Sequence, residues 1–213
     1  MKKDIWNDKN LIKILSGNGV AVMPTDTIYG LVGKALNEDV VSRIYKIKKR
    51  NGDKPFIILI GNIKDLEKFS VALSEKQEKV IEEYWFTPSK VEGSRPTSII
   101  LDCFNEKLKY LSRGTNSLSF RLPNIESLRN LISKVGPLVA PSANPESFSS
   151  AITIKEAKKY FGNSVDPVRG REGSQRPSTS NGVDLYIDGG TVENKHSKLI
   201  KLNKDGSVVV LRE

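Results

Sequence analysis

Apolar residues follow two alternating patterns along the chain. Short continuous apolar runs, such as Val20 to Met23 and Phe56 to Ile60, are typical of strands buried on both faces. Between such runs, apolar residues recur every three or four positions, which is typical of amphipathic helices. The sequence predicts strands at 20–23, 55–60, 97–104, 117–123, 137–140, 183–188, 198–202 and 207–212, and helices at 4–16, 38–50, 63–69, 74–85, 125–134 and 153–161.

This interleaving predicts the α/β fold class, with a twisted, mixed, open sheet and helices on its faces. Two segments interrupt it, 87–96 and 167–182, and both are rich in Gly, Ser, Pro and Arg. Such a composition cannot pack a core, so we interpret both as exposed loop insertions. The alternative is that they are basic flaps that close over an anionic ligand. No linker divides the chain, and we expect one domain over 1–213.

The composition narrows the class of protein. Hydrophobic residues make up 38% and charged residues 28%, which is ordinary for a globular protein. No apolar run approaches the roughly 18 residues of a membrane span, and no secretory signal opens the chain. We therefore expect a cytoplasmic protein with no membrane partner. Cys103 and His196 are the only cysteine and histidine, which excludes an internal disulfide and argues against a zinc site. We interpret Cys103 as a buried, inert thiol.

The net charge of +9 favours anionic partners such as nucleotides or RNA, although many basic proteins bind neither. Four cations crowd the end of the helix at 38–50 and the loop after it: Lys48, Lys49, Arg50 and Lys54. A solvated basic face is one interpretation, because cations stabilise the C-terminal end of a helix. The other is that they converge on a polyphosphate. The chain has no Walker A motif and no Gly-x-Gly-x-x-Gly, so the common phosphate-binding folds are excluded.

Polar side chains follow the first buried strand. Thr25, Asp26, Thr27 and Tyr29 come within five residues, which is more than a plain turn requires. The interpretations are a capped turn and a strand end that faces a substrate. In open α/β sheets ligands bind beyond the strand ends, so a second polar strand end is informative.

Such a second end follows the strand at 137–140. Ser142 and Asn144 can offer a hydroxyl and an amide to a phosphate, or to water around a metal ion. In the strand at 117–123, which we expect to be half-buried, alternation places Ser117, Ser119 and Arg121 on the face opposite Leu118 and Phe120. A buried arginine there needs an anionic partner, either Asp26 or the carboxylate of a substrate.

Five segments together resemble the YrdC/TsaC family, the threonylcarbamoyl-adenylate synthases. They are "MPTDTIYGL", "IYKIKKRNGDKPFIILI", "SLSFRLP", "APSAN" and "DLYIDGG", in the family's order and approximate spacing. The most specific mark is Lys48-x-Arg50 together with Ser142-x-Asn144. The resemblance runs from about residue 10 to the last residue and implies a YrdC-like catalytic domain in its short, single-domain form.

The resemblance also implies a reaction. L-threonine, bicarbonate or CO2, and ATP would form threonylcarbamoyl-AMP and pyrophosphate, in a nucleotidyltransferase that serves t6A37 modification of tRNA. Mg2+ would be the cofactor, carried on the ATP phosphates, with no protein side chain assigned as its ligand. Further partners would be tRNA and a downstream t6A transferase complex. The amine would attack CO2 or bicarbonate and the carbamate would attack the α-phosphate, so the protein would supply positioning and charge neutralisation.

Roles carry over from the family position by position. The implied catalytic residues are Lys48, Arg50, Ser142 and Asn144. The implied ATP contacts are Arg50, Lys54, Ser117, Ser142, Ser150 and Arg212. The implied threonine contacts are Thr27, Arg121, Ala140 and Ser197.

The chain also departs from the family. The usual Trp-Pro-Gly-Pro-x-Thr before the strand at 98–101 is broken, Lys49 replaces a glycine, and Lys198 replaces a threonine. Two alternatives remain: an RNA-binding protein on the same fold without synthase activity, and a carbamoyl-transfer relative with another acceptor. The Lys-x-Arg and Ser-x-Asn pairs favour the synthase, because RNA binding does not require Ser-x-Asn at a strand end. Only 7% of residues are aromatic, whereas RNA-binding proteins tend to expose aromatic side chains.

Overall fold

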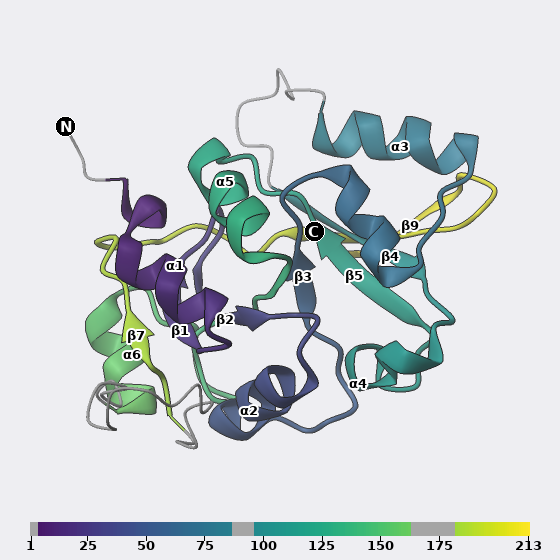
Figure 1. Cartoon of the computed structure of the whole chain (residues 1–213). Coiled ribbons are helices and arrows are strands. Elements are labelled where there is room, and N and C mark those ends of the chain that lie inside the picture. Colours follow the sequence, from purple (N-terminus) through teal and green to yellow (C-terminus); the bar gives the residue numbers. More distant parts are fainter. Residues whose placement is uncertain (1–3, 87–95, 163–181) are drawn as a thin grey trace.

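The computed structural model describes residues 4–86, 96–162 and 182–213, so both predicted insertions lie almost wholly outside the described residues. Within these ranges, nine strands form one sheet in the order β7-β1-β2-β6-β3-β5-β4-β8-β9 (Figure 1). The strands are β1 (Ala21–Pro24), β2 (Tyr29–Lys34), β3 (Ile57–Leu59), β4 (Thr97–Asp102), β5 (Ser117–Arg121), β6 (Leu138–Val139), β7 (Leu185–Tyr186), β8 (Lys198–Leu202) and β9 (Val208–Arg212). Three pairs are parallel, β1 with β7, β3 with β5 and β4 with β8, and the others are antiparallel. The predicted mixed sheet is confirmed.

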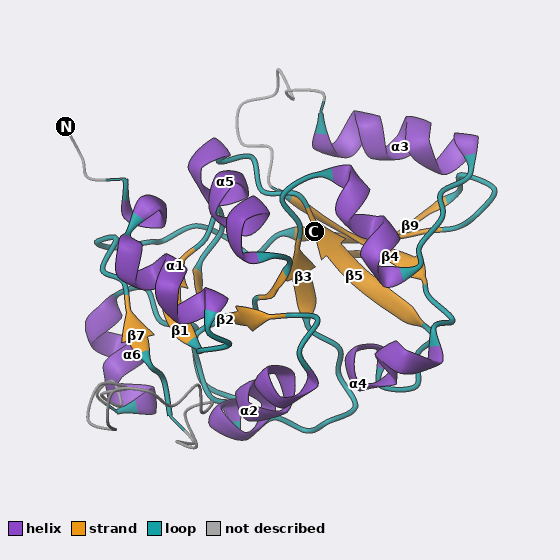
Figure 2. Ribbon diagram, in the orientation of Figure 1, coloured by secondary structure: helices purple, strands orange, loops and turns teal. Residues whose placement is uncertain are grey.

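Helices lie on both sides of this sheet (Figure 2). They are α1 (Lys9–Ser16), α2 (Glu38–Lys48), α3 (Glu75–Trp85), α4 (Lys109–Ser112), α5 (Glu126–Val135) and α6 (Ile154–Phe161), with 3-10 turns at Ile5–Asn7, Ile63–Phe69 and Glu106–Leu108. Side chains of Asn37, Ser74 and Thr153 accept a backbone N–H in the first turn of α2, α3 and α6, which fixes where these helices begin.

Two predicted elements need correction, and one strand was missed. The helix predicted over 4–16 is interrupted, because Asp8 caps α1 and Asp4 caps a separate 3-10 turn. The segment at 63–69 is a 3-10 helix rather than an α-helix. Strand β2 was not predicted, since Gly30 and Gly33 interrupt its apolar pattern.

Two hydrophobic cores pack on opposite faces of the sheet. Along β1, Val22 belongs to one core, and its neighbours Ala21 and Met23 belong to the other. Ile58 and Leu59 in β3 divide in the same way, which confirms a strand buried on both faces. Helices α1 and α5 cover one face (Figure 1).

Two features of the fold bear on the class of protein. Cys103 is buried and its thiol donates to the carbonyl of Phe69 at 3.3 Å, so its prediction as a buried thiol is confirmed. Across the residues that the structure describes, no helix has the length and apolar character needed to cross a bilayer.

Candidate functional site

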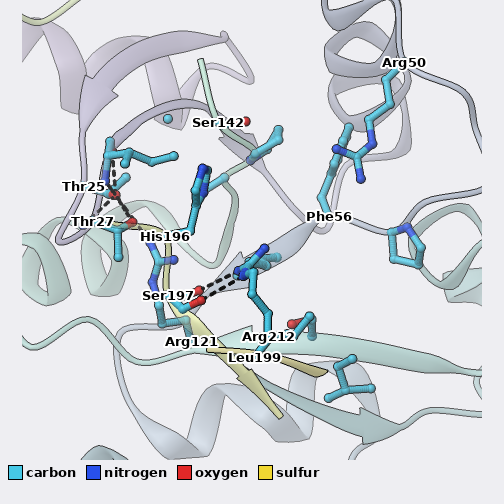
Figure 3. Close-up of a pocket in the computed structure, with 18 of the residues that line it drawn as sticks. Thr25, Thr27, Arg50, Phe56, Arg121, Ser142, His196, Ser197, Leu199 and Arg212 are labelled. Atoms are coloured by element: carbon cyan, nitrogen blue, oxygen red, sulfur yellow. Dashed lines mark hydrogen bonds between the residues drawn. The ribbon is translucent and has the colours of Figure 1, made fainter. Parts of the chain in front are cut away.

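Polar side chains from separate parts of the chain line one cavity of about 360 Å³ (Figure 3). Part of its wall is one face of the sheet, because Ile57, Ser119 and Ile100 are paired side by side on β3, β5 and β4 and all line the cavity. Leu118 and Phe120 point to the core on the opposite face. The volume lies in the range of sites for small molecules, about 300–1,000 Å³.

Strand β5 is more buried than its alternation predicts. Ser119 is only 9% exposed and Arg121 only 3%, so the strand is not half-buried. The polar face of the strand is covered because it lies against the cavity rather than open solvent. Ser119 Oγ has no hydrogen-bond partner among the described residues, which leaves a buried hydroxyl at this wall.

The turn between β1 and β2 explains the dense polar cluster after the first strand. Thr25 Oγ1 accepts the backbone N–H groups of Thr27 and Ile28 at 3.2 and 3.3 Å, and donates to the Ile28 carbonyl at 2.8 Å. It also lies 3.1 Å from Thr27 Oγ1. Both threonines line the cavity, so the turn is capped by its own side chain and also presents hydroxyls to a ligand.

Tyr29, unlike the two threonines, uses its hydroxyl to bond another segment of the chain rather than to line the cavity. The side chain is fully buried, and its hydroxyl donates to the Gly190 carbonyl at 2.8 Å and accepts the Gly189 N–H at 3.0 Å. These bonds fasten the start of the segment that leads to His196 and Ser197. Tyr29 therefore ties the start of β2 to the turn after β7, and it does not itself line the cavity.

Arg121 forms an ion pair with Asp26, one of the two anionic partners that the sequence analysis considered. Its Nη2 lies 2.9 Å from Asp26 Oδ1, with the two side chains 4% and 0% exposed. Arg121 also lines the cavity, and its Nε is buried without a hydrogen-bond partner among the described residues. Asp26 thus fixes the guanidinium and offsets its burial, while the group still faces the space where an anion would bind.

The two cations of the Lys-x-Arg pair diverge. Helix α2 ends at Lys48, and Lys49 adopts the left-handed conformation with φ 49° and ψ 38°, so the chain turns sharply between them. Arg50 lines the cavity with its guanidinium carbon 5.4 Å from the centre of the Phe56 ring. Its Nε is buried without a partner among the described residues.

Lys48 lies behind the cavity wall. It is 1% exposed, and its Nζ donates to the carbonyls of Ser142 and Asn144 at 2.5 Å each. Burial lowers the pKa of Lys48 from 10.5 to about 7; Arg50 adds to this and Glu146 opposes it. Lys48 thus holds the second polar strand end in place, and a contact with phosphate stays a prediction.

At the second polar strand end, the two predicted site residues also have different positions. Ser142 lines the cavity, whereas Asn144 does not. The Asn144 amide donates to the carbonyls of Pro145 and Phe148 at 2.9 and 2.7 Å, which holds the turn that follows. Ser150 also lies outside the lining.

Lys54 is held outside the cavity as well. It pairs with Glu146 at 3.0 Å and its side chain is 64% exposed. The Asn51 N–H donates to the same carboxylate, and this bond, followed by Lys54, lowers the pKa of Glu146.

The last wall comes from β8 and β9. Arg212 donates from Nε to the Ser197 carbonyl at 3.0 Å and from Nη2 to its hydroxyl at 3.2 Å. The Ser197 hydroxyl also lies 2.9 Å from that of Ser98. His196 lines the same wall, and burial, followed by the charges of Arg212 and Arg121, lowers its pKa.

The structure thus sorts the predicted site residues into two groups. Those that line the cavity are Thr27, Arg50, Ser117, Arg121, Ala140, Ser142, Ser197 and Arg212. Those outside the lining are Lys48, Lys54, Asn144 and Ser150. Thr25, from the predicted polar strand end, and Ser119, from the predicted polar face of the strand at 117–123, also line it. Sequence reasoning missed Phe56, Thr115 and His196, which line it as well. The one available signal for His196 was that the only histidine directly precedes a predicted site serine.

The charge of the cavity indicates its ligand. Three arginines line it, and no carboxylate does among the described residues. Over the same residues, no group of three or more His, Cys, Asp or Glu side chains could hold a metal ion. The site therefore suits an anion.

Comparisons with known proteins agree with this architecture. The family model Sua5_yciO_yrdC, described as telomere recombination, matches residues 13–180. The threonylcarbamoyl-AMP synthase of Bacillus subtilis (strain 168) is 33% identical over 133 residues, which cover 62% of this chain and 36% of that protein. The threonylcarbamoyl-AMP synthase of Pseudomonas fluorescens (strain Pf0-1) is 26% identical over 165 residues, which cover 78% of this chain and 85% of that protein.

Among solved structures, that of P. abyssi Sua5 complexed with L-threonine matches with a TM-score of 0.75 and 25% sequence identity. The match covers 98% of this chain and 54% of that chain. The chain thus spans little more than half of this structural relative and about a third of the Bacillus subtilis protein.

Proposed function

This chain belongs to the Sua5/YciO/YrdC family, and we propose that it works as a threonylcarbamoyl-AMP synthase. In this proposal it is a nucleotidyltransferase that converts L-threonine, bicarbonate or CO2, and ATP into threonylcarbamoyl-AMP and pyrophosphate. The product would serve t6A modification of tRNA in the cytoplasm, through a downstream t6A transferase complex. The names of the relatives support the activity, and the relative complexed with L-threonine supports the amino acid.

The observation that carries the proposal is that one cavity offers two separate places for anionic groups. Arg50 stands beside Phe56 on one side, and Arg121 stands beside the Thr25 and Thr27 hydroxyls on the other (Figure 3). A triphosphate and an amino-acid carboxylate are two such groups. Arginine suits both, because its planar fork can donate two parallel hydrogen bonds to a carboxylate or a phosphate.

The chemistry then follows from positioning. The amine of threonine forms a carbamate, a carbamate oxygen attacks the α-phosphate of ATP, and pyrophosphate leaves. Arg50 would neutralise charge on the phosphates, and Arg121 would orient the carboxylate of threonine. Such preorganised charges stabilise the transition state because they need no rearrangement during the reaction.

Mg2+ is the proposed cofactor. The lining provides hydroxyls, among them Ser142 and Thr27, but no carboxylate among the described residues. This donor set would suit a metal ion held chiefly by the ATP phosphates, to which the Ser142 and Thr27 hydroxyls could contribute. When bound, Mg2+ would share the neutralisation of phosphate charge.

A direct assay tests the proposal. The protein is incubated with MgATP, bicarbonate and one of several amino acids, and pyrophosphate release is measured. We expect release that requires bicarbonate and is fastest with L-threonine. Release with a different amino acid would indicate a carbamoyl-transfer relative with another acceptor. Binding of tRNA without pyrophosphate release would indicate the RNA-binding alternative.

A further inference from the structure

His196 lines the proposed site, and it has no role in the function proposed above. Its ring points into the cavity and lies, in the view of Figure 3, between the Thr25 and Thr27 pair and the Arg212 side chain. His196 is also exposed to solvent, so it can exchange protons with water. On its C-terminal side the backbone is held at the next residue, where Arg212 donates from Nε to the Ser197 carbonyl.

The proposed reaction requires a proton acceptor. Threonine in water carries an ammonium group, which has no lone pair and cannot attack bicarbonate or CO2. Among the described lining residues, the titratable side chains are Arg50, Arg121, Arg212 and His196. Arginine stays protonated in proteins, so it cannot accept a proton. This leaves His196 as the one lining group that can do so near neutral pH.

Groups just outside the lining do not replace it. The carboxylate of Asp26 is paired with Arg121 and has a fully buried side chain. Lys48 donates to two carbonyls behind the wall. Neither faces the space where the amine would lie.

We propose that His196 is the general base that takes the proton from the ammonium group of the amino acid before the carbamate forms. This inference rests on the proposed synthase function and extends it to the proton-transfer step. His196 would therefore be a catalytic residue that contacts the substrate amine.

The step is balanced with bicarbonate as the carbon source. An imidazole nitrogen of His196 accepts one ammonium proton, which leaves a neutral amine and an imidazolium. The amine lone pair attacks the bicarbonate carbon, an N–C bond forms, and the C–O bond to the hydroxyl breaks. Water leaves with one N–H proton, and the carbamate remains. The imidazolium then returns its proton to solvent at the exposed side of the ring.

The electrostatic surroundings suit this role. Arg121 on β5 and Arg212 on β9 face the imidazole, and Asp26 offsets part of the charge of Arg121. Burial and these arginines keep the pKa of His196 below its usual 6.5, so the neutral form prevails at pH 7. The rate of the wild-type protein should fall toward acidic pH as the imidazole becomes protonated, and this fall should begin at a lower pH than for an unperturbed histidine.

The test is the variant His196→Gln, which keeps a polar side chain of similar size but cannot accept the proton. At pH 7 we expect its pyrophosphate release with L-threonine to fall at least about 100-fold, the lower end of what general bases contribute. The rate should recover as the pH rises, because free threonine then loses its ammonium proton in solution. Imidazole added to His196→Ala should restore part of the rate. Lys195→Gln, an exposed neighbour outside the lining, is the matched control and should behave as the wild type.

The reverse reaction separates a base from a merely structural residue. Threonylcarbamoyl-AMP and pyrophosphate should yield ATP at an undiminished rate with His196→Gln, because adenylyl transfer involves no ammonium group. Equal losses in both directions, or an unchanged forward rate, would overturn the role of His196. A wild-type protein that catalyses neither direction would overturn the synthase proposal itself, and the inference with it.

Discussion

The cations of an anchor region outside the cavity have protein partners, in contrast to Arg50 on the neighbouring part of the cavity wall. In the anchor region, defined here as Lys48, Lys54, Asn144 and Glu146, each donor has a protein acceptor: backbone carbonyls for Lys48 and Asn144, and a carboxylate for Lys54. On the cavity wall, Arg50 faces the cavity with a buried Nε that has no hydrogen-bond partner among the described residues.

The difference indicates which cations build the site and which bind in it. A buried charge is costly unless it is paired, so protein partners identify groups that hold the framework. A charge left without such a partner at a cavity is a place where a ligand can provide one. Lys48 and Arg50 are two residues apart, yet they belong to different regions.

The largest expected effect is on catalysis at the cavity wall. Arg50→Ala should lower pyrophosphate release about 10²–10³-fold, as is typical when one preorganised donor to transition-state charge is removed. The melting temperature should stay near that of the wild type, since Arg50 Nε has no hydrogen-bond partner in the described part of the chain. Steady-state kinetics and thermal unfolding of the same preparation test this. If the variant unfolds instead, Arg50 stabilises the fold rather than binding a ligand.

The next effect is on stability in the anchor region. Lys48→Met should lower the free energy of unfolding by about 2 kcal/mol or more, because the Ser142 and Asn144 carbonyls lose their donor in a buried place. Chemical denaturation measures this loss. Lys46→Met, earlier on the same helix and exposed, is the control and should be neutral. If the Lys48→Met variant is as stable as the wild type but binds ATP more weakly, the result would contradict the anchoring role and support the phosphate contact that the sequence predicted.

The pH dependence of the free energy of unfolding is a second test of whether Lys48 is buried behind the cavity. The pKa of Lys48 is about 7 in the folded state, against 10.5 for an ordinary lysine. Between these values the unfolded chain binds more protons, so this group makes the protein more stable as pH rises, by at most about 1.4 kcal/mol per pH unit. The stability gap between wild type and Lys48→Met should widen from pH 7 to pH 10. A constant gap would mean that Lys48 stays charged between the two carbonyls.

Arg121 both pairs with a protein carboxylate, Asp26, and lines the cavity, so we expect an intermediate effect. Arg121→Lys keeps a charge near Asp26 but loses the planar fork that matches a carboxylate. The KM for threonine should rise about tenfold, as expected when a charge-assisted hydrogen bond worth roughly 1.5 kcal/mol is lost. The KM for ATP should rise less. Equal changes in the KM for threonine and the KM for ATP would contradict the assignment of Arg121 to the carboxylate of threonine.

The smallest effect is expected at Lys54. Lys54→Ala removes an exposed ion pair with Glu146, and such pairs contribute little to stability. The melting temperature should not change, and the KM for ATP should rise by less than about fivefold. A large rise in this KM would show that Lys54 leaves Glu146 and reaches the phosphates.

Much of the fold could be predicted because its signals are local. The caps at Asn37, Ser74 and Thr153 lie directly before the helices that they begin, and the alternation in β5 gives the face of Arg121. Strand β2 was missed because its two glycines interrupt the apolar pattern.

The environments within the site could not be predicted in the same way. A run of cations near a helix end does not show which one is buried, since the acceptors of Lys48 lie more than ninety residues away in sequence. His196 lies in a loop, where no periodicity indicates the direction of a side chain. The sequence therefore predicted a basic site, but not which of its residues stabilise the fold and which line the cavity.

The order of the chain has a consequence for how the protein comes to work in a cell. Thr25 lies near the start of the sequence and Arg212 near its last residue, yet both line one cavity. Strand β8 adds to β4 across about a hundred residues, a non-local pairing that slows folding. During synthesis, β1 to β6 are made while the wall of β8 and β9 does not yet exist. A nascent chain can thus bury most of its core before it has a complete cavity, and the ability to bind a ligand arrives only once β8 and β9 have been made.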